Sequence, residues 1–405
     1  MKHSKSTLIT SLLLAAAFVL AGCSEKLPEE TSPSPATTTT TAATTEAPTE
    51  PSESETSLPP ETEAPSETTL GPNSTAQVTE KAVQINGQLS VKGTDIVNQN
   101  GEPYQLRGMS TYGLNNLAIP FNDDFVTTMA EDWGCNVIRL AMYTWGETDS
   151  YMINPDKYFN DICNYVDLCI AHDIYVIVDW HILYDGDPNE HTAEAVDFFS
   201  RLSAIYSDCP NIIYEICNEP NGNRYNDESQ PVDWECIKPY AKEVIAAIRE
   251  NDPDNIIIVG TPNWSSDVDI VCDDPLEGEN LMYTFHFYAT SSKQEKRDRI
   301  QVAYDKGLPM FCTEWGCTGD TGGGKVDIEE SQRWIDFMAE RNISWCNWSI
   351  AGGSGETSNA LKIRSQMLTP DQKMAGHWPD QFLSKSGYFV RSQILGQEYV
   401  APDEA

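Results

Sequence analysis

Residues 175–181 read Tyr-Val-Ile-Val-Asp-Trp-His, an apolar run that ends in side chains able to hydrogen-bond or stack. Short continuous apolar runs are typical of parallel β-strands that are buried on both faces. Seven more runs of this kind occur along the chain, with helical patterns between them. The eight expected strands are 106–109, 137–142, 175–178, 212–216, 256–259, 282–285, 310–312 and 343–346.

The segments between these strands include four amphipathic patterns, with apolar residues three and four positions apart. They cover residues 162–170, 195–205, 237–248 and 334–338. Eight alternating units predict an α/β protein of the (β/α)8 TIM-barrel class. Periodicity alone leaves an open doubly wound sheet as the alternative. Before the first unit, residues 89–91 and 95–97 predict a short β-hairpin that leads into the turn-forming pair Asn100-Gly101.

The amino-terminal part has a different composition. Lys2 and Lys5 precede an apolar run over 8–20, followed by Ala21-Gly22-Cys23, which is the order of a secretory signal peptide. Small residues directly before a cysteine resemble the bacterial lipobox, so we expect residues 1–22 to be removed and Cys23 to carry a diacylglycerol. Ordinary signal cleavage, with Cys23 as a bystander, is the alternative. The expected location is the cell surface, anchored to the bacterial membrane, or the medium if the protein is released.

Residues 23–80 consist mainly of Thr, Ser, Pro, Glu and Ala. This composition has too few large apolar residues to form a core, so it predicts an extended, disordered linker. The folded domain is then expected over 81–398, with a short tail over 399–405.

Charge and cysteine content narrow the possible functions. The formal net charge is −36, which disfavours nucleic-acid binding because a polyanion would be repelled. Eleven cysteines are present, and several lie within apolar runs, such as Cys217, Cys312 and Cys346. We interpret these as buried free thiols. No cysteine or histidine cluster has zinc-site spacing, so neither a metal nor an organic cofactor is expected.

Polar and aromatic residues recur where the expected strands end. In a parallel barrel these ends converge on one mouth. Taken singly, a Glu at such a place is more often a surface carboxylate and a Trp more often a core residue. Together they would bury many polar groups at one place, which is costly without a use. The residues concerned are Arg139, Asp179, His181, Asn218, Glu219, Trp264, His286, Tyr288, Glu314 and Trp348.

Two of these residues suggest a reaction. Glu219 follows the fourth expected strand and Glu314 the seventh, and these strands lie on opposite sides of an eight-stranded barrel. Two carboxyl groups about 5–5.5 Å apart are the requirement for glycoside hydrolysis with retention of configuration.

Six stretches carry a specific resemblance, which spans residues 83–395. They are Leu106-Arg107-Gly108-Met109-Ser110, residues 175–181, Ile213-Tyr214-Glu215-Ile216-Cys217-Asn218-Glu219-Pro220, Phe285-His286-Phe287-Tyr288, Glu314-Trp315-Gly316 and Trp345-Cys346-Asn347-Trp348-Ser349. With these, the chain resembles glycoside hydrolase family 5 of clan A, most closely its bacterial endoglucanases. The resemblance implies an endo-acting β-1,4-glucanase that binds β-glucan and works by double displacement.

The resemblance also implies residue roles. Glu219 would be the acid/base and Glu314 the nucleophile, which Arg139 would hold and keep ionised. Asn218 would bond the sugar 2-OH, and His181 would contact the sugar next to the cut. His286 would lie beside Glu219 and Tyr288 beside Glu314, with Trp348 as a stacking platform. Further substrate-binding candidates are Tyr112, Tyr143 and Trp264, the last with core packing as its alternative.

The chain departs from the family pattern in two places. Many relatives have a Ser-x-His-Gly-Leu-Gln-Trp stretch where this chain has Tyr112 and Asn116, so one stacking face is missing on the non-reducing side. The loop over 351–356 lacks a lysine that some relatives have. Mannan, lichenan or xyloglucan therefore stay open as substrates, as does a glycan-binding protein without catalysis. A monomer is expected.

Overall fold

The computed structural model describes residues 82–222, 232–351, 357–362 and 378–402. These residues all belong to the second of the two units into which the chain divides, 71–405. The expected signal peptide, Cys23 and the linker 23–80 lie outside the described residues. Within the described part, none of the helices combines the length and the apolar character needed to cross a bilayer.

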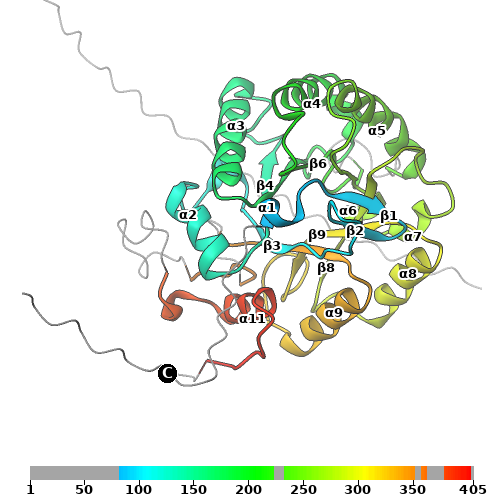
Figure 1. Cartoon of the computed structure of the whole chain (residues 1–405). Coiled ribbons are helices and arrows are strands. Elements are labelled where there is room, and N and C mark those ends of the chain that lie inside the picture. Colours follow the sequence, from blue (N-terminus) through cyan, green and yellow to red (C-terminus); the bar gives the residue numbers. More distant parts are fainter. Residues whose placement is uncertain (1–81, 223–231, 352–356, 363–377, 403–405) are drawn as a thin grey trace, which may run out of the picture. The chain divides into compact units, whose positions relative to one another are not determined.

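Eight parallel strands form a closed barrel in which each strand pairs with its neighbours in the chain and β10 pairs with β3 (Figure 1). Closure confirms the (β/α)8 architecture over the open doubly wound sheet. Each strand lies at one of the predicted runs, and the long ones extend further toward their polar ends. The strands are β3 (Arg107–Ser110), β4 (Val137–Tyr143), β5 (Tyr175–His181), β6 (Ile212–Glu215), β7 (Ile257–Val259), β8 (Leu281–Tyr288), β9 (Met310–Gly316) and β10 (Ser344–Asn347).

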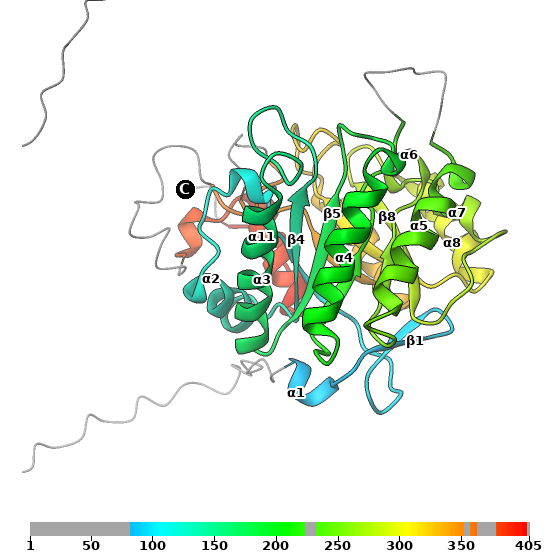
Figure 2. The ribbon, with the colours of Figure 1, turned by 90° about the horizontal axis from the view of Figure 1, so that it is seen from above.

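Helices surround the barrel (Figures 1 and 2). The four predicted patterns correspond to α3 (Pro155–Ala171), α4 (Thr192–Tyr206), α5 (Trp234–Arg249) and α9 (Ile328–Glu340). The sequence reasoning did not assign α2 (Asp123–Thr127), α6 (Pro262–Ser265), α7 (Val268–Val271), α8 (Gln294–Asp305) or α11 (Lys385–Ile394).

Helix α8 shows why one of these helices was missed. Only Arg297, Ile300 and Ala303 are buried, so its apolar stripe is too thin to register as an amphipathic pattern. At the carboxyl end, Tyr399 packs against Phe389 of α11, with ring centroids 5.5 Å apart. The folded part therefore continues at least one residue past the expected boundary at 398.

The predicted hairpin is present as β1 (Ser90–Lys92) and β2 (Asp95–Val97), which pair antiparallel. Its turn contains Gly93, whose φ of 65° is a left-handed conformation that glycine adopts without strain. Asn100-Gly101 forms the next turn, in which the Gly101 amide donates to the Asn98 carbonyl (2.8 Å). The hairpin and α1 (Ala82–Asn86) lie at one end of the barrel (Figure 2). Leu89 and Ile96 belong to the same apolar cluster as the barrel interior.

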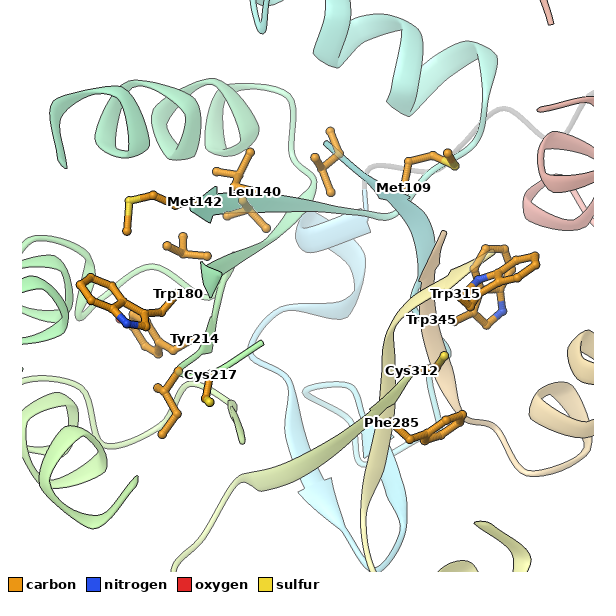
Figure 3. Close-up of a cluster of buried hydrophobic side chains, with 14 of the residues drawn as sticks. Met109, Leu140, Met142, Trp180, Tyr214, Cys217, Phe285, Cys312, Trp315 and Trp345 are labelled. Carbon is orange, nitrogen blue, oxygen red and sulfur yellow. The ribbon is translucent and has the colours of Figure 1, made fainter. Parts of the chain in front are cut away.

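Alternation along the strands separates two kinds of core. Trp180 of β5, Tyr214 of β6 and Trp345 of β10 belong to the layer between barrel and helices (Figure 3). On the inner face of β5, Tyr175 and Ile177 fill the amino end of the barrel. Successive strand residues point to opposite faces, so the next inward positions on β5 are the polar ones near its carboxyl end.

Strand β9 breaks this alternation with one extra residue. Thr284 pairs with Phe311 and His286 pairs with Glu314, so two residues of β8 oppose three of β9. The pairing of β9 with β10 shifts in the same region. Such a β-bulge redirects the side chains that follow it. As a result Glu314 faces the barrel interior, although it directly follows the inward-facing Thr313.

The cysteine prediction is also confirmed within the described residues. All ten cysteines there are free thiols, and six of them are buried. Cys217 and Cys312 belong to the layer between barrel and helices, where they pack as small apolar side chains.

Candidate active site

Arg139 lies at the centre of the barrel mouth and is fully buried. Its Nε donates to Glu215 Oε2 (2.7 Å), and its Nη2 lies 2.9 Å from Asp179 Oδ2. Its Nη1 donates to Glu314 Oε2 (3.2 Å). One guanidinium therefore contacts three buried carboxyl groups from three strands. Its planar fork allows this number of directed contacts, which an ammonium could not reproduce.

Glu314 receives a second donor from the neighbouring strand. The Tyr288 hydroxyl donates to Glu314 Oε1 at 2.7 Å. Both oxygens of Glu314 are thus hydrogen-bonded by groups that favour the ionised form. The predicted positions of Arg139 and Tyr288 beside Glu314 are confirmed.

Glu219 faces Glu314 across the mouth. His286 Nδ1 lies 2.9 Å from Glu219 Oε1, as predicted. One oxygen of Glu219, one of Glu314 and one ring nitrogen of His286 all lie within 4.8 Å of one another. So close an approach of two carboxyl oxygens fits the separation of about 5–5.5 Å in a retaining glycosidase and lies below the roughly 6.5–9.5 Å of an inverting one. Three such atoms could also hold a metal ion.

Burial changes the protonation of this pair. It raises the pKa of Glu219 to about 7, against the opposing effect of Arg139 and Lys296. Burial and the nearby Glu219 carboxylate also raise the pKa of Glu314, while His286 and Arg139 lower it. Arg139 therefore acts in the predicted direction, but burial outweighs it. Since Glu314 has two directed donors that stabilise its charge, a proton shared by the pair is favoured on Glu219.

The two histidines of the site are neutral. Burial lowers the pKa of both His181 and His286 to about 3. His181 Nδ1 lies 2.5 Å from Asp179 Oδ2. The His181 ring stacks on Trp348, with centroids 5.3 Å apart and an angle of 11° between the planes. These contacts fix the orientation of His181 at the carboxyl end of β5.

Asn218 is fully buried behind the carboxylates. Its Oδ1 accepts from Arg139 Nη2 (2.6 Å) and its Nδ2 donates to the Ile182 carbonyl (3.0 Å). Both ends of the amide are thus engaged within the protein, where they help to orient Arg139. The expected contact with a sugar 2-OH stays a prediction.

Two adjoining cavities form the cleft over this site. One, of about 370 Å³, is lined by Glu219, Glu314 and most of the predicted contact residues, including Tyr112, Tyr143, His181, Tyr288 and Trp348. The other, of about 420 Å³, includes His286, Lys296 and Asn263. Glu219, Trp264 and Tyr288 line both. Glu219 therefore lies where the two cavities meet, and Glu314 lines the first of them.

The aromatic candidates differ in exposure. Trp348 is only 5% exposed and packs against Tyr112, with centroids 5.4 Å apart, so it presents little of its face to the cleft. Trp264 is 37% exposed, which favours a platform over core packing. Its backbone has a φ of 56° between Asn263 and Ser265, which also have positive φ. Consecutive left-handed residues of this kind are costly and are found at functional sites.

Several site residues were missed or given no role from the sequence. Glu215 and Thr313 face the interior and hydrogen-bond each other at 2.6 Å. Alternation could have found Glu215, because it shares the inner face with Ile213. Tyr184 lines the cavity and is 44% exposed, and its ring lies 5.7 Å from that of Trp145. Both residues lie in loops, where periodicity gives no signal.

A closed (β/α)8 barrel with two facing carboxyl groups at its carboxyl-terminal mouth defines the class of barrel glycoside hydrolases. The family model described as "Cellulase (glycosyl hydrolase family 5)" matches residues 97–354. The chain therefore belongs to glycoside hydrolase family 5.

Named relatives agree with this assignment. The chain is 44% identical to an endoglucanase of Clostridium saccharobutylicum, over 84% of this chain and 71% of the relative. It is 44% identical to endoglucanase A of Evansella cellulosilytica, over 75% of this chain and 59% of the relative. The second relative is thus much longer than the region that the two proteins share.

Solved structures show the same fold. The catalytic domain of alkaline cellulase K superimposes with a TM-score of 0.73 at 33% identity, over 81% of this chain and 99% of that one. The endoglucanase catalytic domain of Thermobifida fusca gives 0.69 at 36% identity, over 77% and 99%.

Proposed function

We propose that the protein is a retaining endo-β-1,4-glucanase in which Glu219 is the acid/base and Glu314 the nucleophile. The observation that carries the proposal is the approach of an oxygen of each carboxyl group to within 4.8 Å, in a cleft that continues past Glu219 into a second cavity. A cleft that extends beyond the carboxyl pair suits a long glucan chain.

The reaction has two steps. Glu314 attacks the anomeric carbon while Glu219 gives its proton to the departing glycosidic oxygen, which leaves a covalent glycosyl ester on Glu314. Water then attacks the same carbon, loses a proton to Glu219 and releases Glu314. The raised pKa of Glu219, about 7 through burial, suits the first role. The donors Arg139 and Tyr288 suit a carboxylate that leaves in the second step.

Glucan is favoured over mannan and xyloglucan as the substrate. The supporting fact is that the curated relatives of the same family are named endoglucanases. A polysaccharide panel tests this: we expect reducing-sugar release from carboxymethyl-cellulose and barley glucan to exceed that from mannan. Cleavage of mannan alone would overturn the substrate assignment.

Two variants test the roles. Glu314→Gln should lose turnover by orders of magnitude and still bind cello-oligosaccharides, whereas a pure binding protein would have no turnover to lose. Glu219→Gln should lose activity on cellulose but keep much of its kcat/KM on dinitrophenyl cellobioside, whose leaving group needs little protonation in the first step. Its kcat should still fall, because the second step then lacks the base. A fluorinated glycosyl substrate should trap an ester on Glu314. An ester on another residue would refute the assignment.

We further propose that the protein is exported, cut before Cys23 and held at the membrane by a lipid on that thiol, and that it works as a monomer. The support is the order of basic, apolar and small residues before Cys23. Labelled palmitate should enter the wild-type protein but not Cys23→Ala, which should appear in the medium. Label in both proteins would exclude this anchor. Light scattering of the purified catalytic domain tests the monomer.

A further inference from the structure

Behind Glu219 lies a chain of buried hydrogen bonds whose direction can be assigned. It runs from Glu219 through His286 and Thr313 to Glu215. His286 Nδ1 lies 2.9 Å from Glu219 Oε1, and His286 Nε2 lies 3.0 Å from Thr313 Oγ1. Thr313 Oγ1 in turn lies 2.6 Å from Glu215 Oε1. All of these contacts are buried, so each hydrogen must be donated to one of the neighbouring groups in this row of hydrogen bonds.

The carboxyl group of Glu215, at the end of this row, determines where the Thr313 hydroxyl hydrogen points. Arg139 donates to both oxygens of Glu215, through Nε at 2.7 Å and Nη2 at 3.1 Å. Burial raises the pKa of Glu215, and Arg139 opposes this effect. Because the guanidinium donates to both oxygens, neither is placed to carry a hydrogen toward Thr313, and both act as acceptors. The hydroxyl hydrogen of Thr313 therefore points to Glu215.

A second threonine, Thr284, determines which lone pair of the Thr313 hydroxyl is left for His286. Thr284 Oγ1 lies 2.6 Å from Thr313 Oγ1 and already accepts from the Thr313 amide at 3.2 Å. Since the Thr313 hydrogen is used on Glu215, the hydrogen between the two hydroxyls comes from Thr284. Thr313 Oγ1 is then left with one lone pair for His286, and only an N–H on Nε2 can donate to it.

We propose that Thr313 is a positioning residue that holds His286 as the tautomer with its hydrogen on Nε2, so that Nδ1 faces Glu219 as an acceptor and favours the protonated acid. The inference rests on the proposed role of Glu219. After Glu219 has given its proton to the leaving oxygen, a carboxylate faces the lone pair of Nδ1. This repulsion favours the return of a proton from the attacking water, which completes the cycle with no net change in the site.

Thr313→Val tests the proposal, because valine keeps the shape and removes only the hydroxyl. His286 can then turn Nε2 into an acceptor and donate from Nδ1 to an ionised Glu219. We expect the alkaline limb of the kcat/KM profile to move down by about 1 pH unit, the equivalent of one hydrogen bond. Thr313→Ser is the matched control: serine keeps the hydroxyl, so this variant should have the wild-type pH profile. Thr284→Val should have a smaller effect, because Glu215 still orients the Thr313 hydroxyl.

Substrate choice separates this effect from a general loss of packing. At pH 7, Thr313→Val should lose several-fold more activity on methylumbelliferyl cellobioside than on dinitrophenyl cellobioside. An equal loss on both substrates, or an unmoved alkaline limb, would overturn the proposal.

A direct measurement covers the case in which Thr313→Val does not fold. Nitrogen-15 NMR of the wild-type imidazoles distinguishes the two tautomers, and His286 should carry its hydrogen on Nε2. A hydrogen on Nδ1 would refute the proposed role of Thr313 in setting the His286 tautomer, even if Glu219→Gln behaves as an acid/base variant should. If the activity of Glu219→Gln does not depend on the leaving group, the proposed role of Glu219 is refuted. The inferred tautomer of His286 is then still decided by the nitrogen-15 measurement.

Discussion

Arg139 Nη1 lies 3.2 Å from Glu314 Oε2, although the two residues are on β4 and β9 and 175 positions apart. The same guanidinium binds Glu215 of β6 through two nitrogens. The Arg139 side chain thus connects the proposed nucleophile, Glu314, to strand β6. The proposed acid, Glu219, lies just after the end of that strand. The geometry of the cleft depends on this buried pairing as much as on the strands.

Arg139→Lys should damage both stability and activity. Lysine keeps the charge but loses the planar fork, which leaves at least one buried carboxylate without its donor. We expect the free energy of unfolding in urea to fall by about 2–4 kcal/mol and kcat to fall at least 100-fold, by about 3 kcal/mol of transition-state stabilisation. Arg201→Lys is the control, because Arg201 pairs with Asp197 on the exposed face of α4. Equal stability of the two variants would contradict the prediction.

Glu219→Gln should become relatively more stable as the pH rises. The folded-state pKa of Glu219, about 7, is above its ordinary value of 4.5. The folded protein therefore binds the extra proton between these values, and this contribution to stability is complete below pH 4.5 and lost as the pH rises through 7. Glutamine removes the dependence. The melting temperature of the variant minus that of the wild type should increase from pH 4.5 to 7.5, by the equivalent of about 1–3 kcal/mol.

The exposed Glu340→Gln provides the reference for that comparison, since its side chain is 72% exposed. Its difference from the wild type should stay flat over the same range. If the melting-temperature difference between Glu219→Gln and the wild type also stays constant with pH, burial does not raise the pKa of Glu219.

Tyr184→Ala should weaken the binding of long substrates. The Tyr184 ring is exposed at the cleft rim and rests against Trp145, so its face is available to the apolar C–H surface of a sugar. We expect KM for cellopentaose to rise about three- to tenfold, as for the loss of roughly 1 kcal/mol of aromatic contact, with little change for cellotriose. Tyr184→Phe keeps the ring and should behave as the wild type. A length-independent change would place the ring outside the substrate path.

Reducing agents should leave the fold unaffected. The ten cysteines of the described region are free, so no disulfide there contributes to stability. Dithiothreitol should not change the melting temperature of the catalytic domain. In the native state the exposed Cys236 should be the first thiol to react with a disulfide reagent, although partial burial and Asp233 raise its pKa and slow the reaction. Cys236→Ser should remove this first phase, and a large drop in melting temperature on reduction would contradict the free-thiol structure.

Added metal ions should inhibit, and chelation should not. Glu219, His286 and Glu314 offer three ligand atoms within 4.8 Å of one another, and a nitrogen with two carboxylates suits Cu²⁺ or Zn²⁺. These ions should compete with cellotetraose in calorimetry, and Glu314→Gln should bind them more weakly. EDTA should leave turnover unchanged. Loss of activity in EDTA, restored by one metal, would require a different mechanism.

The sequence by itself determined the eight β/α units, the hairpin and the residues at the strand ends, while the closure of the barrel was decided by the structure. This was possible because strands buried on both faces have a continuous apolar signal, and because the carboxyl ends of parallel strands must meet. It also indicated two carboxyl groups at one mouth. It did not indicate α8, whose apolar stripe is thin, or the loop aromatics Trp145 and Tyr184.

Only the tertiary structure decided how those side chains face one another. Strict alternation along β9 would place Glu314 outward, since Phe311 and Thr313 point inward, and the β-bulge reverses this. The bulge depends on pairing with two neighbouring strands, which no local pattern records. The protonation of Glu219, the donors on Glu314 and the threonine contacts of His286 likewise come from residues far apart in the chain. Burial and distance set them, and both arise only once the barrel has closed.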